Sequence, residues 1–230
     1  FGPQKAAGGC QLEQAAFLLC MASPSDPAVI LQNLLLGSKL IAESWPVLER
    51  HGVTHILNAA REIPNFHEAS GKAVYLHLDL NDDGDDDITA DFQRCNEFIS
   101  AARDANCCIL VHCQAGISRS ATLVIAYLMA SELMSLREAF LLVKSKRSNI
   151  GPNEFYMQAL VAYEDFLRPD HRKGEAPSFT MKEYYLETLL AMGFEREAAA
   201  EAVERADGRF ELALNFVLSE PTARGSARIH

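Results

Sequence analysis

Two kinds of hydrophobic pattern alternate between residues 28 and 167. Short runs of consecutive apolar residues predict buried strands at 28–36, 53–58, 74–80 and 107–112. Apolar residues three or four positions apart predict helices at about 40–48, 92–102, 120–133, 136–147 and 154–167. Gly37 is expected to end the first strand, and Gly52 to follow the first helix. Strands that alternate with helices favour an α/β fold in which helices cover both faces of a sheet.

The pattern changes after residue 168. Residues 169–180 contain proline, glycine and charged side chains with few apolar ones, which is typical of a linker. Residues 181–220 contain three short helical patterns and predict a small three-helix bundle. Residues 1–27 are expected to be a leader that is disordered or partly an added segment. The predicted units are a leader, an α/β domain, a linker, a helical module and a flexible tail, at 1–27, 28–168, 169–180, 181–220 and 221–230.

Composition narrows the classes of function. The 230 residues carry 21 basic and 31 acidic side chains, and this net charge of −10 argues against nucleic-acid binding. No apolar stretch reaches the roughly 18 residues that a membrane-spanning helix needs, so no membrane partner is expected. The six cysteines include no CxxC pair, which argues against a zinc site. Their isolated and adjacent spacing favours a reducing compartment, the cytoplasm with the nucleus as a second location.

The segment HCQAGISRS, residues 112–120, joins the predicted strand at 107–112 to the predicted helix at 120–133. Backbone N–H groups of such a loop and the positive end of the helix dipole converge on one point, where they bind an anion. The same field favours the thiolate form of Cys113. Gly116 lets the backbone curl without a Cβ clash, and Arg119 offers a planar fork for two phosphate oxygens. The pattern therefore predicts a nucleophilic cysteine at a phosphate site.

This segment resembles the HCxxGxxR[ST] signature of cysteine-dependent phosphatases, and more narrowly that of the dual-specificity protein phosphatases. The resemblance extends from about Ile30 to Leu167, although Phe155 stands where family members often have a small residue. It implies a central mixed sheet flanked by helices, with no metal and no cofactor. It also implies that Cys113 attacks phosphorus and forms a phosphocysteine.

The resemblance assigns roles to the neighbours of Cys113. Ser120 would hydrogen-bond the departing thiolate during hydrolysis, and His112 would order the loop from behind. Taken alone, His112 is as readily explained as a hydrogen-bonded core histidine. The phosphate oxygens would be held by the Arg119 guanidinium and by the backbone amides of Gln114, Ala115, Gly116, Ile117, Ser118 and Arg119.

A leaving alkoxide or phenoxide needs a proton donor, and the acidic segment 79–87 supplies the candidates. The family pattern places this acid seven residues after a strand tyrosine and six before an isoleucine. Tyr75 and Ile88 both point to Asp82, with Asp83 as the alternate. Asp85, Asp86 and Asp87 are expected to be solvated loop residues.

The same segment has a second interpretation. Asp79, Asn81, Asp83 and Gly84 match the first half of an EF-hand calcium loop. The twelfth position of that loop would be Ala90, which cannot chelate, and a strand rather than a helix is predicted before it. A general acid is therefore the favoured interpretation and calcium the alternative.

The loop also bears on the substrate. Relatives that act on inositol lipids tend to carry lysines inside the loop, whereas Gln114, Ala115 and Ile117 add no positive charge here. The resemblance therefore implies a protein phosphatase that hydrolyses phosphotyrosine and phosphoserine or phosphothreonine. The alternatives are a catalytically weak adaptor that binds phosphoproteins, and a phosphatase for a non-protein phosphoester.

Residues 181–220 resemble a ubiquitin-associated (UBA) domain, whose Met-Gly-Phe-type loop and third helix contact ubiquitin. The matching residues are Met192, Gly193 and Phe194, with Leu218 on the third helix. Ubiquitin or ubiquitinated proteins are the expected partners, beside a phosphoprotein substrate. The linker would leave the module free to tether the enzyme. The alternative is a C-terminal helical cap that packs on the phosphatase domain.

Overall fold

The computed structural model describes residues 26–83, 86–169 and 178–219. Within these residues the α/β domain contains a five-stranded sheet in the order β1-β2-β5-β3-β4. The pair β1–β2 is antiparallel and the other pairs are parallel, so the sheet is mixed as expected. The strands are β1 (Ala28–Leu31), β2 (Leu34–Ser38), β3 (Val53–Asn58), β4 (Val74–His77) and β5 (Cys108–Cys113).

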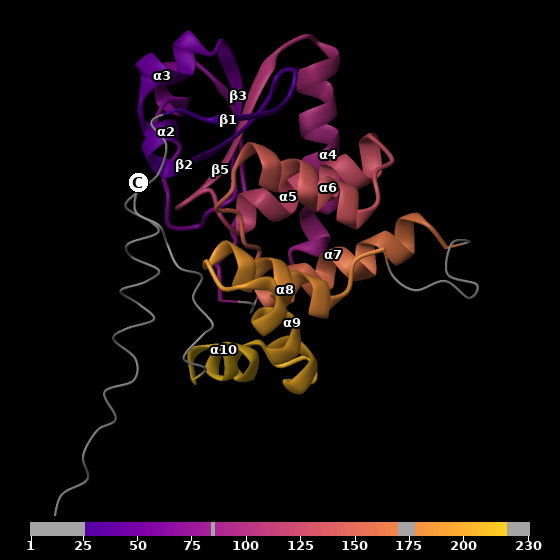
Figure 1. Cartoon of the computed structure of the whole chain (residues 1–230). Coiled ribbons are helices and arrows are strands. Elements are labelled where there is room, and N and C mark those ends of the chain that lie inside the picture. The colour runs from indigo at the N-terminus through magenta and orange to yellow at the C-terminus, as the bar shows by residue number, and fades with distance from the viewer. Residues whose placement is uncertain (1–25, 84–85, 170–177, 220–230) are drawn as a thin grey trace, which may run out of the picture.

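Helices cover both faces of the sheet (Figure 1). One face carries α2 (Lys39–Glu43) and α3 (Trp45–Arg50), and the other carries α4 (Thr89–Asp104), α5 (Arg119–Ser131) and α6 (Leu136–Lys146), with α7 (Glu154–Leu167) packed against α5. A short 3-10 turn, η1 (Glu68–Ser70), precedes β4. None of the described helices is long and apolar enough to cross a membrane.

The central strand β5 explains why its sequence is apolar without alternation. Ile109 and Val111 pack into the core beneath α4 and α5, whereas Leu110 packs into the smaller core beneath α2 and α3. A parallel strand with helices on both faces has no solvent-exposed side, so consecutive residues are hydrophobic. Helix α5 is buried over most of its length because it packs between the sheet and the helices α4, α6 and α7.

The first predicted strand, 28–36, is wrong in detail. It is two antiparallel strands, β1 and β2, joined at Gln32 and Asn33. Asn33 adopts a left-handed backbone with φ of 63°, a conformation that asparagine tolerates better than most residues. Gly37 does not end the strand, because it pairs with His112 of β5 inside β2.

The first predicted helix, 40–48, is also divided. Ser44 separates α2 from α3 with an extended backbone, φ −87° and ψ 93°. Pro46 lies in the first turn of α3, where its missing N–H leaves no helical hydrogen bond unmade. In a continuous helix Pro46 could not donate a hydrogen bond to the carbonyl four residues earlier. The first helix therefore ends before Pro46, and a new helix, α3, begins at Trp45.

The described C-terminal residues form three helices, as predicted. They are α8 (Met181–Ala191), α9 (Arg196–Arg205) and α10 (Phe210–Ser219). A capping box begins α8, since Thr180 accepts from the Glu183 N–H while the Glu183 carboxylate accepts from the Thr180 N–H. Gly193 and Gly208 follow α8 and α9 with φ of 89° and 77°. We call residues 181–219 the helical module.

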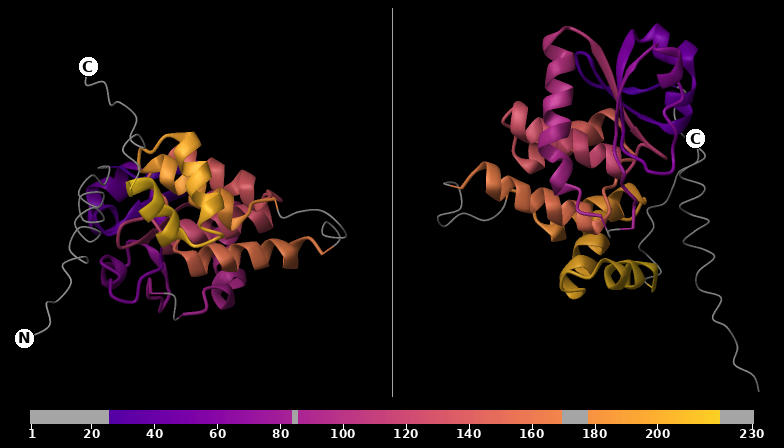
Figure 2. Two further views of the ribbon diagram at one scale, coloured as in Figure 1. Left: turned by 60° about the horizontal axis from the view of Figure 1, so that its bottom comes forward. Right: turned by 180° about the vertical axis from the view of Figure 1, so that it is seen from behind.

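The helical module packs against the α/β domain, near α6 and α7 (Figure 2). Phe179, inside the predicted linker, is buried against Phe140 of α6 with ring centroids 5.1 Å apart. Ser178 donates to the Glu164 carboxylate of α7 at 2.6 Å. The expectation of a free tether is therefore wrong for this end of the linker. Residues 170–177, the leader through residue 25 and the tail from residue 220 lie outside the described residues.

Candidate active site

The nucleophile loop has the predicted strand–loop–helix geometry. Cys113 is the last residue of β5, and α5 begins at Arg119. The Ser120 hydroxyl donates to Cys113 Sγ at 3.1 Å, so it stabilises negative charge on the sulfur. Both side chains are buried. The first turn of α5 therefore holds a hydroxyl donor, and the positive end of its dipole, at the thiol.

Four carbonyl oxygens of this loop accept hydrogen bonds from residues outside it. The Arg147 guanidinium, at the end of α6, donates to Gly116 O at 2.7 Å and to Ala115 O at 2.8 Å. The backbone N–H of Lys39 donates to Gln114 O at 3.1 Å, and that of Gly151 to Ile117 O at 3.0 Å. With these carbonyls held, the loop amides are free to turn toward a bound anion.

Gly116 is required by two separate constraints. Its φ is 70°, in the left-handed region, and a Cβ built there would lie 2.5 Å from Gly37 O. The loop thus rests directly on the backbone of β2 beside Cys113. The sequence predicted the first constraint, whereas the close approach to Gly37 depends on strand order.

Arg119 is clamped by a residue that the sequence analysis missed. Its two terminal nitrogens donate to the Glu62 carboxylate at 2.8 and 2.7 Å, and one of them also donates to Leu80 O at 3.0 Å. This hydrogen bonding holds the pKa of Glu62 below its usual value. Among the described residues the buried Arg119 Nε has no hydrogen-bond partner. The guanidinium is therefore fixed in place while one donor stays available.

Asp82 lies next to the nucleophile loop in space, although the two are distant in sequence. Its Oδ1 accepts from the Ser118 hydroxyl at 2.6 Å and from Asn153 Nδ2 at 2.9 Å, and its Oδ2 is 3.6 Å from Arg119 Nε. Asn153 caps the N-terminus of α7 with its side-chain oxygen, and this contact fixes the orientation of the side-chain amide that donates to Asp82. The structure thus brings a carboxyl group beside the nucleophile loop.

Two residues of the calcium interpretation have partners of their own in the structure. Asp79 pairs with Arg61, and the backbone N–H of Asn81 donates to Asp86 at 2.6 Å. Gly84 lies outside the described residues, and no group of three or more acidic, histidine or cysteine side chains in the described part of the chain gathers as a metal site.

His112 is buried behind the loop. Its Nδ1 lies 3.4 Å from Cys113 O, and burial lowers its pKa from 6.5 to about 4. The ring is therefore neutral at physiological pH and contributes position rather than charge.

Three residues beyond the predicted set support the site: Glu62, Arg147 and Asn153. Arg147 is 3% exposed, and burial lowers its pKa. Asn153 lies inside the stretch from about Ile30 to Leu167 that resembles the family, so the resemblance could have drawn attention to it. Glu62 and Arg147 have no local signal, because each reads as a charged residue beside a loop.

The predicted ubiquitin contacts divide in the structure. Met192 and Leu218 are 46% and 53% exposed, and the space around Gly193 is open. Phe194 is only 8% exposed, because its ring packs into the core of the helical module. Nothing in the structure tests whether Phe194 contacts ubiquitin, which stays a prediction; in this conformation its ring anchors the loop that presents Met192.

Comparison with known proteins agrees with this geometry. The family model "Dual specificity phosphatase, catalytic domain" matches residues 34–166, so the chain belongs to that family. The model "UBA/TS-N domain" matches residues 183–217. The chain therefore combines a dual specificity phosphatase catalytic domain with a UBA-type module.

Particular relatives and solved structures are similar to about two thirds of the chain. Human dual specificity protein phosphatase 9 is 40% identical over 151 residues, which are 66% of this chain and 39% of that protein. The crystal structure of human DUSP28 is 34% identical, with a TM-score of 0.60, over 63% of this chain and 97% of that one. A human tyrosine phosphatase-like serine/threonine/tyrosine-interacting protein is also 34% identical, with a TM-score of 0.56, over 62% of this chain and 98% of that one. The chain spans about two fifths of the length of the curated relatives it matches.

Proposed function

We propose that this protein hydrolyses phosphotyrosine and phosphoserine or phosphothreonine in proteins through a phosphocysteine intermediate. The Cys113 thiolate attacks phosphorus while Arg119 and the loop amides hold the non-bridging oxygens. Asp82 gives its proton to the departing oxygen. Asp82, now a carboxylate, then takes a proton from the water that attacks the phosphocysteine. Inorganic phosphate leaves, and the thiolate is regenerated beside the Ser120 hydroxyl.

One observation carries the proposal. The Ser120 hydroxyl donates to Cys113 Sγ at 3.1 Å in the same loop where Glu62 and Leu80 O fix the Arg119 guanidinium. A buried structural cysteine needs neither a hydroxyl donor nor an oriented guanidinium. A nucleophile that must be a thiolate next to a phosphate needs both.

The choice of protein substrates rests on the loop and on the relatives. Gln114, Ala115 and Ile117 bring no cationic side chain to the phosphate site, which supports a single phosphate rather than a multiply charged inositol headgroup. The relatives are named as dual specificity protein phosphatases.

The experiment measures turnover of p-nitrophenyl phosphate and of phosphotyrosine and phosphothreonine peptides by the full chain. Cys113→Ser should abolish turnover, because a hydroxyl stays protonated where the thiol ionises. Cys107→Ser, which alters a half-exposed cysteine before β5, is the matched control and should leave turnover intact.

The outcomes separate the alternatives. Peptide binding without turnover in the wild-type chain would favour the adaptor. One of the similar solved structures is named as a tyrosine phosphatase-like interacting protein. Turnover of p-nitrophenyl phosphate but of neither peptide would favour a non-protein phosphoester. Residual activity in Cys113→Ser would overturn the nucleophile assignment.

We further propose that the helical module binds ubiquitin through Met192, the open loop at Gly193, and Leu218. A contact built on a few exposed apolar side chains is small, so affinity should be modest and should rise with multivalent ubiquitin chains. Titrating labelled ubiquitin with the full chain by NMR tests this, with Leu218→Ala weakening the shift changes. No shift changes at high excess would leave the module with a structural role alone.

We also propose a reducing compartment, the cytoplasm with the nucleus as a second location. Support comes from the four cysteines that the structure describes, all of which are free thiols. Fluorescence microscopy of the tagged chain tests this, and fluorescence confined to the secretory pathway would overturn it.

A further inference from the structure

The helical module touches the loop between α6 and α7, and that loop touches the candidate active site. The Tyr184 hydroxyl, on α8, donates to the carbonyl oxygen of Pro152. The adjacent N–H, that of Asn153, donates to Ser118 Oγ at 3.1 Å. The carbonyl of Pro152 and the N–H of Asn153 belong to one planar peptide unit. This peptide is therefore held at one edge by the module and at the other by the nucleophile loop.

The held peptide sets the position of the proposed acid. Asn153 follows it directly and donates its side-chain amide to Asp82 Oδ1 at 2.9 Å. Ser118, which accepts from the Asn153 N–H, donates its own hydroxyl to the same carboxylate oxygen at 2.6 Å. Both donors to Asp82 thus depend on the orientation of the Pro152–Asn153 peptide.

Tyr184 is well suited to act as this holding donor. Its ring is 7% exposed and meets the Phe140 ring edge to face, with centroids 5.8 Å apart and an interplanar angle of 85°. Burial raises the pKa of the hydroxyl to about 12, so it keeps its proton at physiological pH. A Cβ added to Gly151 would lie 3.8 Å from the Tyr184 hydroxyl and 3.9 Å from the Ile117 side chain, which shows how closely module and nucleophile loop approach.

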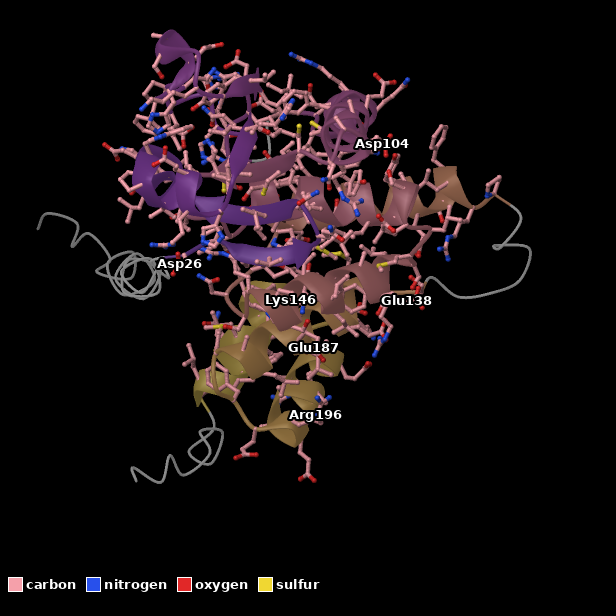
Figure 3. The ribbon with its side chains drawn as sticks, turned by 90° about the horizontal axis from the view of Figure 1, so that it is seen from above. Asp26, Asp104, Glu138, Lys146, Glu187 and Arg196 are labelled. Carbon is pink, nitrogen blue, oxygen red and sulfur yellow. The ribbon has the colours of Figure 1, made fainter. Side chains whose placement is uncertain are left out.

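Other contacts keep α8 in register with α6. Arg137 of α6 pairs with Glu183 at 2.6 Å, and Phe179 packs beside Phe140. Figure 3 shows the arrangement, with Glu138 and Lys146 on α6 and with Glu187 and Arg196 on the module. The tyrosine hydroxyl is thus presented from a packed helix rather than from a mobile chain end.

We infer that Tyr184, a residue of the UBA-type module, is a positioning residue for the general acid Asp82. The inference rests on the proposed function. It makes the module part of the catalytic unit as well as a binding module. A positioning role predicts a particular kinetic signature, because proton donation matters most when the leaving group is poor.

The experiment compares Tyr184→Phe with wild type in the full chain. The substitution keeps the ring against Phe140 and removes only the hydroxyl. A net hydrogen bond is worth about 0.5–1.5 kcal/mol, so kcat on a phosphothreonine peptide should fall about twofold to tenfold. The kcat on p-nitrophenyl phosphate, whose leaving group needs little protonation, and both KM values should change less than about twofold.

Tyr163→Phe is the matched control. Its hydroxyl accepts from Asn96 at 3.1 Å between α4 and α7, away from the nucleophile loop, and both substrates should be turned over as by wild type. Equal losses on the two substrates with Tyr184→Phe would indicate general loosening of the fold and would overturn the inference. Unchanged kinetics would overturn it too.

A double-mutant cycle provides an independent test. Asn153→Ser keeps a helix-capping oxygen but removes the amide donor to Asp82. If Tyr184 acts through Asn153, the loss on phosphothreonine peptide in the double variant should be smaller than the product of the single losses. Multiplicative losses would overturn the inference. Wild-type turnover that is lost in Cys113→Ser but kept in Tyr184→Phe would remove only the role of Tyr184, whereas an inactive wild type would remove the proposed function itself.

Discussion

Phe179→Ala tests whether the helical module is integral to the folded protein. The Phe179 side chain is 1% exposed, packs on Phe140 and lies under the Arg137 guanidinium, which is 5.8 Å from the ring centroid. Replacing a buried phenylalanine by alanine costs about 3–5 kcal/mol through lost apolar burial and the cavity left behind. Because this site joins two units that can close partly over the gap, we expect the lower end, about 3 kcal/mol.

Denaturant unfolding of the full chain measures this cost. For a protein of this size, about 3 kcal/mol corresponds to a fall in Tm of roughly 6–12 °C. Phe166→Ala is the control, since that ring is 77% exposed on α7 and its removal should cost less than about 1 kcal/mol. A similarly small loss for Phe179→Ala would refute the reasoning, because it would mean that the ring leaves water only in part and that the module is a loose tether.

Four further predictions concern the site. Asp82→Asn should lower kcat on phosphothreonine peptide far more than on p-nitrophenyl phosphate; if Asp83→Asn shows that selectivity instead, the register of the acid is off by one. Glu62→Gln should lower kcat/KM about threefold to tenfold on both substrates by loosening the Arg119 clamp, and unchanged steady-state kinetics would contradict this. The His112 pKa is lowered from 6.5 to about 4, so between these pH values the folded state binds fewer protons than the unfolded state. The contribution of His112 to the free energy of unfolding is therefore fully present above pH 6.5 and should fall by about 3 kcal/mol as the pH drops to 4. Urea titrations at several pH values measure this slope, which His112→Asn should flatten. Turnover should persist in a chelator, and loss that calcium restores would support a metal site at residues 79–83 instead.

The nucleophile loop could be predicted because its chemistry is local. Cys113, Gly116, Arg119 and Ser120 lie within eight consecutive residues, and strand, loop and helix dipole follow from adjacent patterns. The strand–loop–helix geometry and the contact between Ser120 and Cys113 are as expected. Asp82 was reached only through a family spacing, and its contacts with Ser118 and Asn153 depend on how distant loops meet.

The α/β class, the phosphate loop and the three helices of the C-terminal module can be predicted from the amino-acid sequence, because each depends on hydrophobic periodicity and on short-range backbone chemistry. The other features depend on contacts between segments that are distant in sequence. Glu62 meets Arg119 only because β3 lies next to β5 in the sheet, and the β1–β2 turn at Asn33 depends on which strand pairs with which. Phe179 looks like a lone aromatic in a polar linker until α6 supplies Phe140 beneath it. The hydrophobic effect is not directional, so a sequence pattern predicts that an apolar side chain is buried but does not predict which distant residues bury it.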